Sequence, residues 1–276
     1  MNFDGSVLLE MNKIQIEMFK DFDSVCKKLG IQYFLIHGSL LGAIRNGQFV
    51  EYDDDIDIAL LREDYEKLIN SKDLFKKKYF LQCDKTEKYY YLNFAKLIDL
   101  QTTYIVEGTE NLKLHHGVYI DIFPIDFYEK RKLHDLLLKF AQVRVAYSTK
   151  QNKTLIYKAV YLFSHLLFSR KGALKFINKP YIRKQTERII IRGGKKADIG
   201  LNYSMFFPPR KIKFEGVESW CPNDSNSYLE AIYGKDFFEY DLVEKLKCEN
   251  GMIITNASYI SLNEPCINGD IETTIQ

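Results

Sequence analysis

The amino-acid sequence predicts an α+β fold for this chain of 276 residues. Three observations lead to this prediction. Segments of strand length mix irregularly with amphipathic helical segments over the first half, a helical and basic block follows, and the C-terminal part combines short strands with one helix. A hydrophobic content of 46%, with 14% aromatic residues, is typical of a packed core and excludes a disordered chain.

The predicted elements follow one another without an internal repeat. Apolar side chains recur on one helical stripe over residues 8 to 29, and Gly30 is a typical helix stop. The next elements in order are a strand over 31–36, a short helix in LLGAIRNG, a strand around 56–60, an exposed helix over 62–70, strands between 78 and 106, a strand over 117–123 that ends at Pro124, a helical stretch from Lys130 to about Arg192, a loop at Gly193-Gly194, and a helix near 228–233.

The cysteines and the N-terminus bear on the compartment. The five cysteines lie far apart and form no CxxC motif or Cys/His cluster, so we expect neither a disulfide framework nor a structural zinc site: Cys26, Cys83, Cys221, Cys248 and Cys266. The N-terminal residues lack the basic and apolar runs of a signal peptide, and no segment has the roughly 18 apolar residues of a membrane span. We therefore expect a cytoplasmic protein.

The net charge of +2 hides a strong asymmetry along the chain. From Lys130 to Lys196 there are 18 Lys and Arg residues and two acids, Asp135 and Glu187, so this block carries +16 and the remainder −14. Such a block suits a surface that meets the phosphates of lipid, nucleic acid or polymer, and it equally suits a solvated helical face. The sequence alone leaves both interpretations open.

An acidic cluster in the segment YDDDIDIAL carries the clearest functional signal. Asp53, Asp55 and Asp57 alternate with other residues, so on an extended chain their carboxylates share one side while Ile56 and Ile58 fill the other. Three close carboxylates repel one another, and a divalent cation relieves that repulsion. Oxygen ligands favour Mg²⁺ or Mn²⁺. An exposed acidic loop is the alternative, but it does not explain the apolar alternation.

A further carboxylate lies in a later strand, and a glycine turn precedes the acidic cluster. Asp121 stands between Ile120 and Ile122, where an isolated carboxylate is costly unless it is paired or binds a ligand. We expect it to join Asp55 and Asp57 from a neighbouring strand. Its alternative is an edge-strand position facing water. Upstream, Gly38-Ser39 ends a strand and opens a helix, a geometry that offers backbone N–H groups to phosphate.

Together these features resemble the nucleotidyltransferase fold of the polymerase-beta type, and more closely the LicD family of phosphotransferases, which includes the fukutin-related enzymes. The segments that carry the resemblance are HGSLLGAIRNGQF, DDDIDI, FAKLIDLQTTYI and HHGVYIDIFPIDFY, with a looser match at SYLEAIYGKDF. The resemblance covers residues 31–128 well. The family often has glycine where this chain has His37, and Pro-Trp where it has Glu51-Tyr52.

The resemblance implies a metal-dependent transfer of a phosphorylated head group, such as phosphocholine or an alditol phosphate, from a CDP-linked donor to a hydroxyl of a cell-surface glycan, with release of CMP. It also implies a core with a mixed sheet flanked by helices. We expect residues 1–128 to form this catalytic core, residues 129–196 a basic helical insertion, and residues 197–276 a segment that completes the catalytic domain.

The resemblance also implies roles for individual residues. The metal ligands would be Asp53, Asp55, Asp57 and Asp121, and Asp55, Asp57 and Asp121 would be the catalytic carboxylates, with Asp121 the candidate proton acceptor. Gly38 and Ser39 would hold donor phosphate oxygens. Arg45 and Lys96 are candidate phosphate clamps or surface ion-pair partners, and His116 is a candidate hydrogen-bond donor to the acceptor.

The basic block contains YKAVYLFSHLLF, residues 157–168, an apolar and aromatic run with basic flanks that is typical of an interfacial helix. Because acceptors in the family are often lipid-linked or teichoic-type glycans, this helix would keep the protein at the inner face of an anionic membrane. The alternative is an ordinary buried helix within the insertion.

Three other functions compete with phosphotransfer. The same fold can transfer a nucleotidyl group from a free NTP to a small molecule or protein. The basic block could bind nucleic acid, but it lacks the glycine and aromatic pattern of a single-strand binder and any known docking motif, so we expect no nucleic-acid partner. The presence of all four aspartates argues against an inactive scaffold.

Overall fold

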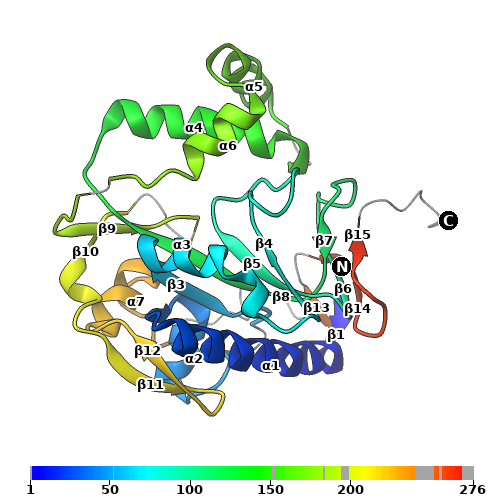
Figure 1. Cartoon of the computed structure of the whole chain (residues 1–276), viewed down its shortest axis with the longest axis vertical. Helices are drawn as coiled ribbons and strands as arrows, with labels where there is room; N and C mark the ends of the chain where they lie inside the picture. The colour runs from blue at the N-terminus through cyan, green and yellow to red at the C-terminus, as the bar shows by residue number, and fades with distance from the viewer. Residues whose placement is uncertain are drawn as a thin grey trace.

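The computed structural model describes residues 2–51, 53–150, 153–182, 184–193, 199–239, 252–254 and 257–268. Tyr52, Gly194, Lys196 and Cys248 lie outside the described residues. The described part has an α+β architecture in which a curled mixed sheet is flanked by helices, as the sequence predicts (Figure 1). Cys26, Cys83, Cys221 and Cys266 are free thiols.

The main sheet has seven strands. Five follow the order β10-β9-β8-β3-β2, and β5 joins β8 to β4. Their bounds are β2 (Tyr33–Leu35), β3 (Asp57–Leu61), β4 (Tyr79–Gln82), β5 (Ala95–Asp99), β8 (Tyr119–Phe127), β9 (Arg188–Ile191) and β10 (Leu201–Asn202). The central strand is β8, which pairs in parallel with β3 on one edge. Its other edge pairs in antiparallel fashion, first with β5 and then with β9.

Four two-stranded sheets surround the main sheet and connect the C-terminal part to earlier segments. Three of them pair a C-terminal strand with one far upstream: β13 (Met252–Ile254) with β1 (Asn2–Asp4), β14 (Ala257–Ser261) with β6 (Thr103–Val106), and β15 (Ile267–Asn268) with β7 (His115–His116). The fourth is the hairpin of β11 (Arg210–Phe214) and β12 (Val217–Cys221). The last described segment therefore returns to the N-terminal half of the chain.

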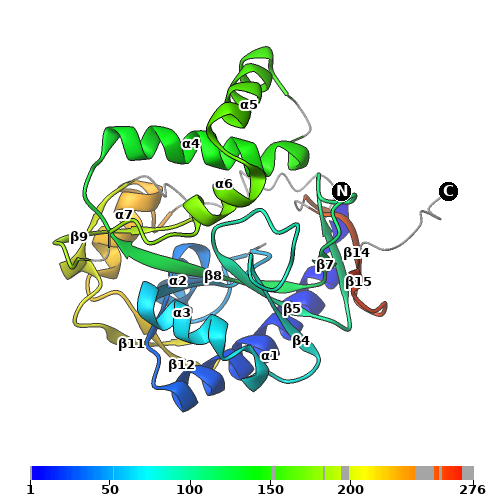
Figure 2. The ribbon, with the colours of Figure 1, turned by 45° about the horizontal axis from the view of Figure 1, so that its top comes forward.

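Helices cover the sheet, and three further helices extend away from it. Those packed on the main body are α1 (Gly5–Leu29), α2 (His37–Arg45), α3 (Arg62–Asn70) and α7 (Ser225–Tyr233). The other three, which we call the insertion, are α4 (Lys132–Ala146), α5 (Leu155–Leu167) and α6 (Arg170–Ile177). Figures 1 and 2 show them stacked at one end of the molecule, with α5 outermost. No helix in the described part of the chain has the length and apolar character needed to cross a bilayer.

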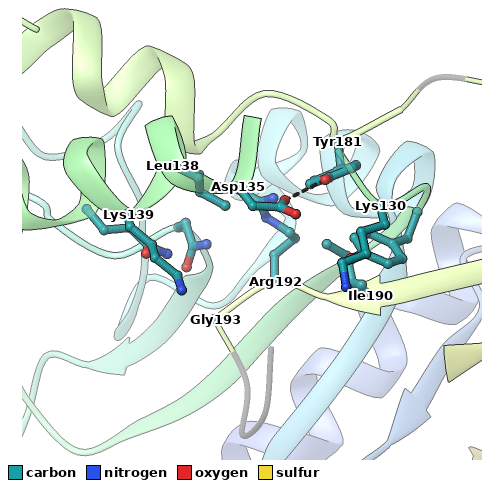
Figure 3. A pocket seen from close by; sticks show the side chains of 11 residues that line it. Lys130, Asp135, Leu138, Lys139, Tyr181, Ile190, Arg192 and Gly193 are labelled. Atoms are coloured by element: carbon teal, nitrogen blue, oxygen red, sulfur yellow. Dashed lines mark hydrogen bonds between the residues drawn. The ribbon is translucent and has the colours of Figure 1, made fainter. Parts of the chain in front are cut away.

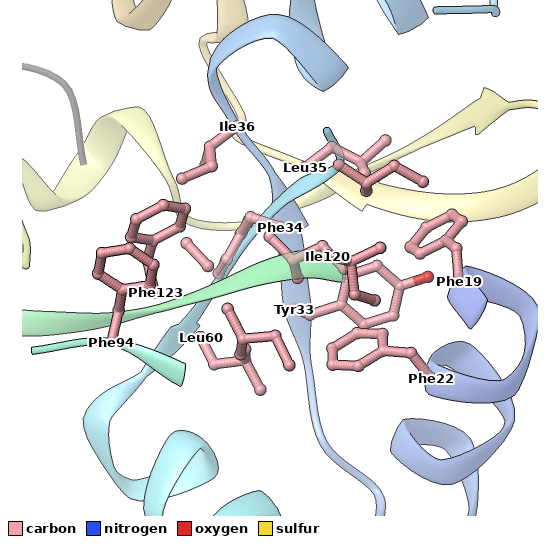
Figure 4. Packing of buried hydrophobic residues seen from close by; sticks show 14 of the residues in the cluster. Phe19, Phe22, Tyr33, Phe34, Leu35, Ile36, Leu60, Phe94, Ile120 and Phe123 are labelled. Carbon is pink, nitrogen blue, oxygen red and sulfur yellow. The ribbon is translucent and has the colours of Figure 1, made fainter. Parts of the chain in front are cut away.

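The largest hydrophobic core lies between the sheet and its covering helices. The apolar stripe predicted on residues 8 to 29 is buried in α1, where Phe19 and Phe22 are fully covered. Both rings meet Tyr33 of β2 edge-on, with centroids 5.9 and 5.2 Å away (Figure 4). The insertion has a separate small cluster around Ala141 and Ile177. The insertion thus packs largely on itself.

Two of the predicted elements differ in the structure. The strand expected to end at Pro124 continues to Phe127. The backbone N–H of Asp121 points toward β3, and backbone groups alternate between the two edges of a strand. The nitrogen of Pro124, three residues later, therefore points to the opposite edge, between the stretches of β8 that pair with β5 and with β9. Proline is tolerated there because no hydrogen bond from its nitrogen is needed. The helical pattern expected up to about Arg192 ends at Ile177 instead, and residues 188–191 form a strand because Ile189, Ile190 and Ile191 are buried in β9 of the main sheet.

A buried carboxylate of the sheet holds segments from both sides of the insertion in the sequence. The Asp126 side chain in β8 is fully buried and accepts two hydrogen bonds from the guanidinium of Arg62, at 2.7 and 3.0 Å. It also accepts the backbone N–H of Tyr181 at 3.1 Å, and its Oδ2 lies 3.8 Å from Nε of Arg192. Three separate segments of the chain therefore contact the single carboxylate of Asp126.

We expect Asp126→Ala to lower the free energy of unfolding by about 3–5 kcal/mol, because it leaves the Arg62 and Arg192 guanidinium groups without their buried counter-charge. Urea denaturation followed by circular dichroism measures the change. The matched control is Glu129→Ala, an exposed carboxylate that contacts Arg131 at 3.3 Å and should change stability by less than about 0.5 kcal/mol. Equal effects of the two substitutions would contradict the prediction.

Candidate active site

Two aspartates face each other across the parallel strand pair at the centre of the sheet. Asp57, the first residue of β3, is the register partner of Asp121 in β8. Register partners on neighbouring strands project to the same face, so the two carboxylates lie side by side. Both are buried, with exposures of 9% and 7%. The expected meeting of Asp121 with the acidic cluster therefore occurs through strand pairing.

The acidic segment before β3 adds further carboxylates. Residues 53–56 reach β3 without regular secondary structure, so the strand alternation expected for Asp53 and Asp55 begins only at Asp57. Oxygen atoms of Asp55, Asp57 and Asp121 lie within 4.8 Å of one another, and so do those of Asp53, Asp54 and Asp55. Asp55 belongs to both groups. The four aspartates expected as metal ligands thus form two overlapping groups, together with Asp54.

A lysine lies directly opposite Asp121 on the other edge of β8. Lys96 in β5 is its register partner, and Nζ of Lys96 lies 2.6 Å from Oδ1 of Asp121. The ammonium group also lies 3.2 Å from the centroid of the Tyr119 ring. Burial raises the pKa of Asp121 to about 6, the Lys96 charge opposes that rise, and the Asp55 charge adds to it. Lys96 is therefore a buried counter-charge within the cluster.

Asp54 is a member of the site that the sequence analysis did not include among the metal ligands. Its carboxylate accepts a hydrogen bond from the Tyr104 hydroxyl at 3.0 Å. Burial, followed by the neighbouring charge of Asp55, raises the pKa of Asp54 to about 7. The Gln15 side chain of α1 holds the segment by donating to the carbonyls of Asp54 at 2.7 Å and Tyr119 at 3.1 Å. The sequence does contain a signal for Gln15, because it is a polar residue on the apolar stripe of α1.

Gly38 and Ser39, at the start of α2, lie against the aspartates. A Cβ atom on Gly38 would be 2.2 Å from Oδ2 of Asp53, so a side chain there would force the Asp53 carboxylate to move. The Ser39 hydroxyl is fully buried and accepts the backbone N–H of Asp57 at 2.9 Å. Gly38 and Ser39, which are predicted to hold donor phosphates, thus also contact Asp53 and the backbone of Asp57.

His37 precedes this glycine in an unusual backbone conformation. Its φ of +47° lies in the left-handed region, where glycine is favoured. The His37 side chain is buried, and its Nδ1 is hydrogen-bonded to the Tyr228 hydroxyl of α7 at 3.1 Å. Helix α7 thus supports the turn. Burial raises the pKa of Tyr233 in the same helix, and the nearby Asp57 charge raises it further.

The other two predicted residues lie apart from the carboxylates. Arg45 ends α2, at the opposite end from Gly38, and its Nη2 donates to the Phe237 carbonyl at 3.0 Å. His116 in β7 is buried, with Nε2 3.1 Å from the Leu112 carbonyl oxygen. With Lys96 and Tyr119, His116 lines a small cavity of about 30 Å³.

A large pocket lies between the insertion and the sheet, away from the carboxylates. It has a volume of about 580 Å³ (Figure 3). Among its lining residues are Lys130, Lys139 and Arg192. Asp135 in the same wall accepts a hydrogen bond from the Tyr181 hydroxyl at 2.5 Å. None of the predicted site residues lines this pocket.

Comparison with known proteins identifies the family. The family described as "LicD/FKTN/FKRP, nucleotidyltransferase domain" matches residues 30–166, a range that includes all the predicted site residues. This chain belongs to the LicD family. The lipopolysaccharide cholinephosphotransferase LicD of Haemophilus influenzae is 25% identical over 256 residues, which cover 82% of this chain and 90% of the relative.

Two uncharacterized rickettsial proteins match a shorter part of this LicD family chain. The Rickettsia typhi protein is 28% identical over 130 residues, covering 47% of this chain and 40% of its own. The Rickettsia prowazekii protein is 26% identical over 131 residues, covering 47% of each.

We expect Lys96→Met to destabilise the metal-free protein by about 3–5 kcal/mol at pH 8, because it leaves the Asp121 carboxylate buried without its cation. The loss should be smaller at pH 5. Burial already raises the pKa of Asp121 above its unfolded value, so without Lys96 the carboxyl is protonated in the folded state at pH 5, and stability falls as the pH rises. Urea unfolding in the presence of a chelator measures both values, and an equal loss at both pH values would contradict the prediction.

Proposed function

We propose that this LicD family enzyme transfers phosphocholine or a similar phosphorylated head group from a CDP-linked donor to a hydroxyl of a cell-surface glycan, and releases CMP. The family and the Haemophilus relative support the coarser statement, that the chain is a transferase of phosphate-containing groups. The single observation that carries the proposal is the gathering of Asp55, Asp57 and Asp121 within 4.8 Å. Phosphocholine is the first candidate because the relative is a cholinephosphotransferase that acts on lipopolysaccharide.

The carboxylate cluster fits divalent cations. Its potential ligands are all oxygen atoms, and Lys96 is the cation paired with Asp121. We propose that Asp55, Asp57 and Asp121 hold one Mg²⁺ or Mn²⁺, and that Asp53 and Asp55, with Asp54 beside them, hold a second. When bound, these ions would neutralise the donor pyrophosphate and make the attacked phosphorus more electrophilic.

The chain's own residues would orient the donor and take the proton. The acceptor hydroxyl oxygen forms a bond to the phosphorus of the head group, the bond from that phosphorus to the bridging oxygen breaks, and CMP leaves with that oxygen. Asp121, whose pKa is raised to about 6 chiefly by burial, is the proposed acceptor of the hydroxyl proton. The backbone of Gly38 and Ser39, at the N-terminal end of α2, would bind donor phosphate oxygens.

Roles are also proposed for the remaining predicted residues. Lys96 would keep the Asp121 side chain in place and could reach a donor phosphate. His116, which lines a small cavity together with Lys96, would hydrogen-bond the acceptor. Arg45 would act on the phosphates only if the Phe237 carbonyl released it. Transfer of a nucleotidyl group from a free NTP is the second candidate function, and the nucleotidyltransferase description of the family domain favours it.

A thermal-shift panel tests the proposed function directly. The full chain is heated with CDP-choline, CDP-ethanolamine, CDP-glycerol, CDP-ribitol, CTP or ATP, each with and without Mg²⁺. We expect one CDP conjugate to stabilise the protein in a metal-dependent way, by about 2.7 kcal/mol at a concentration 100-fold above its dissociation constant.

The shift should disappear in Asp55→Asn, which changes the carboxylate common to both groups, and persist in the control Asp73→Asn, an exposed acid elsewhere. Stabilisation by ATP or CTP alone would contradict phosphotransfer and support the NTP-dependent reaction. Detection of CMP as the product, with a choline-bearing glycan, would complete the test.

We also expect Gly38→Ala to weaken Mg²⁺-dependent donor binding by about 10- to 100-fold, because its Cβ would displace the Asp53 carboxylate, 2.2 Å away. Calorimetric titration measures the affinity, and circular dichroism shows whether the fold is retained. The control is Gly172→Ala in α6, where the new Cβ would be 3.1 Å from Oγ of Ser169. Unchanged binding by Gly38→Ala would show that Asp53 is not needed.

A further inference from the structure

The outward face of α5 is an apolar surface that no other described part of the chain covers. Six of the 13 exposed large apolar side chains among the described residues lie on this one helix. Leu155, Leu162 and Leu166 follow a helical stripe and are 83%, 69% and 80% exposed. Ile156, Phe163 and Leu167 are also exposed on α5, although the Phe163 ring packs beside Phe140 of α4 with its centroid 5.3 Å away. The alternative of an ordinary buried helix is therefore wrong for this segment.

The inner face of the same helix is firmly packed, so its orientation is fixed. Tyr161 stacks on Tyr147 with ring centroids 3.6 Å apart, and Arg144 of α4 lies 5.6 Å from the Tyr161 ring. Ser164 is fully buried, and the Thr154 hydroxyl caps the helix by accepting the Tyr157 N–H at 3.2 Å. The apolar side chains thus face outward because aromatic residues occupy the side toward α4.

Basic residues flank the apolar surface of α5 along the sequence. The sequence contains no acidic residue between Asp135 and Glu187, a range that includes all of α5 and α6. Lys158 is exposed on α5 itself, and Lys171 is exposed at the start of α6, four residues beyond the end of α5. An apolar face whose charged neighbours along the sequence are all basic fits a surface with acyl chains beneath anionic head groups better than it fits an acidic or neutral protein.

We propose that α5 binds the surface of an anionic membrane, with its exposed leucines among the upper acyl chains and its neighbouring lysines on lipid phosphates. In both views of the molecule α5 is the outermost element of the insertion, so it can reach a flat surface without hindrance from the sheet (Figures 1 and 2). This inference does not depend on the reaction that the protein catalyses. If the acceptor is lipid-linked, the contact would also concentrate the enzyme at its substrate.

Vesicle sedimentation of the full chain tests the proposal, with phosphatidylcholine vesicles that contain or lack phosphatidylglycerol. We expect binding to the anionic vesicles that decreases as salt is added. The double variant Leu162→Glu and Leu166→Glu should bind at least roughly tenfold more weakly, because two inserted side chains become charged. The control is Leu9→Glu, which changes a leucine of α1 with a similar exposure of 64% and should leave binding unchanged.

Two further variants separate the outcomes. Replacement of Lys158 and Lys171 by glutamine should weaken binding to anionic vesicles by roughly fivefold per charge. Asp55→Asn should bind vesicles as the unaltered chain does, whatever its effect on donor binding. Absence of binding at low salt, or equal binding by the Leu162 and Leu166 variant, would overturn the proposal. So would a dimer in sedimentation velocity that this variant dissociates, since α5 would then contact a second copy.

Discussion

The repulsion between aspartates that strand pairing brings together is the constraint on which the centre of this protein depends. Asp57 and Asp121 lie side by side because β3 and β8 pair in parallel, and Asp55 lies within 4.8 Å of both. Like charges in a buried environment destabilise one another unless an opposite charge or bound cation compensates. Lys96 supplies one compensating charge from the other edge of β8. The remaining negative charge is what makes the cluster suitable for metal-assisted phosphate chemistry.

The surroundings of the cluster hold the carboxylates by contacts from distant parts of the chain. Ser39 accepts the Asp57 N–H, Gln15 binds the carbonyl of Asp54, and Tyr104 donates to its carboxylate. Tyr228, from near the end of the chain, supports His37 in the turn before α2. The carboxylates are therefore fixed by the main body. The insertion contacts that body through Arg170, which donates to the carbonyls of Lys88 and Tyr89, and through the Ile177 carbonyl, which accepts from Arg192, and it directs α5 away from the sheet.

Much of the fold could be predicted because local periodicity reports which side of an element is buried. The apolar stripe of residues 8 to 29 and the helix over 62–70 appear as α1 and α3. The strand that continues past Pro124 and the strand over 188–191 differ from the sequence prediction for the same reason. A proline interrupts a strand only where the neighbouring strand requires a backbone N–H at that position. The isoleucines of β9 form a strand because they pair with an edge of β8. Neither fact is local.

The sequence by itself determined the chemistry of the site: the spacing of Asp55 and Asp57, the isolated Asp121 in an apolar strand, and the Gly38-Ser39 turn. Only the tertiary structure decided which groups meet. It brought Asp54 into the cluster, made Lys96 the partner of Asp121, and left Arg45 at the far end of α2. It also turned the apolar side of α5 outward. The physical reason is that residue type and period fix the character of each face, whereas strand register and helix packing, which join residues far apart in the chain, fix its neighbours.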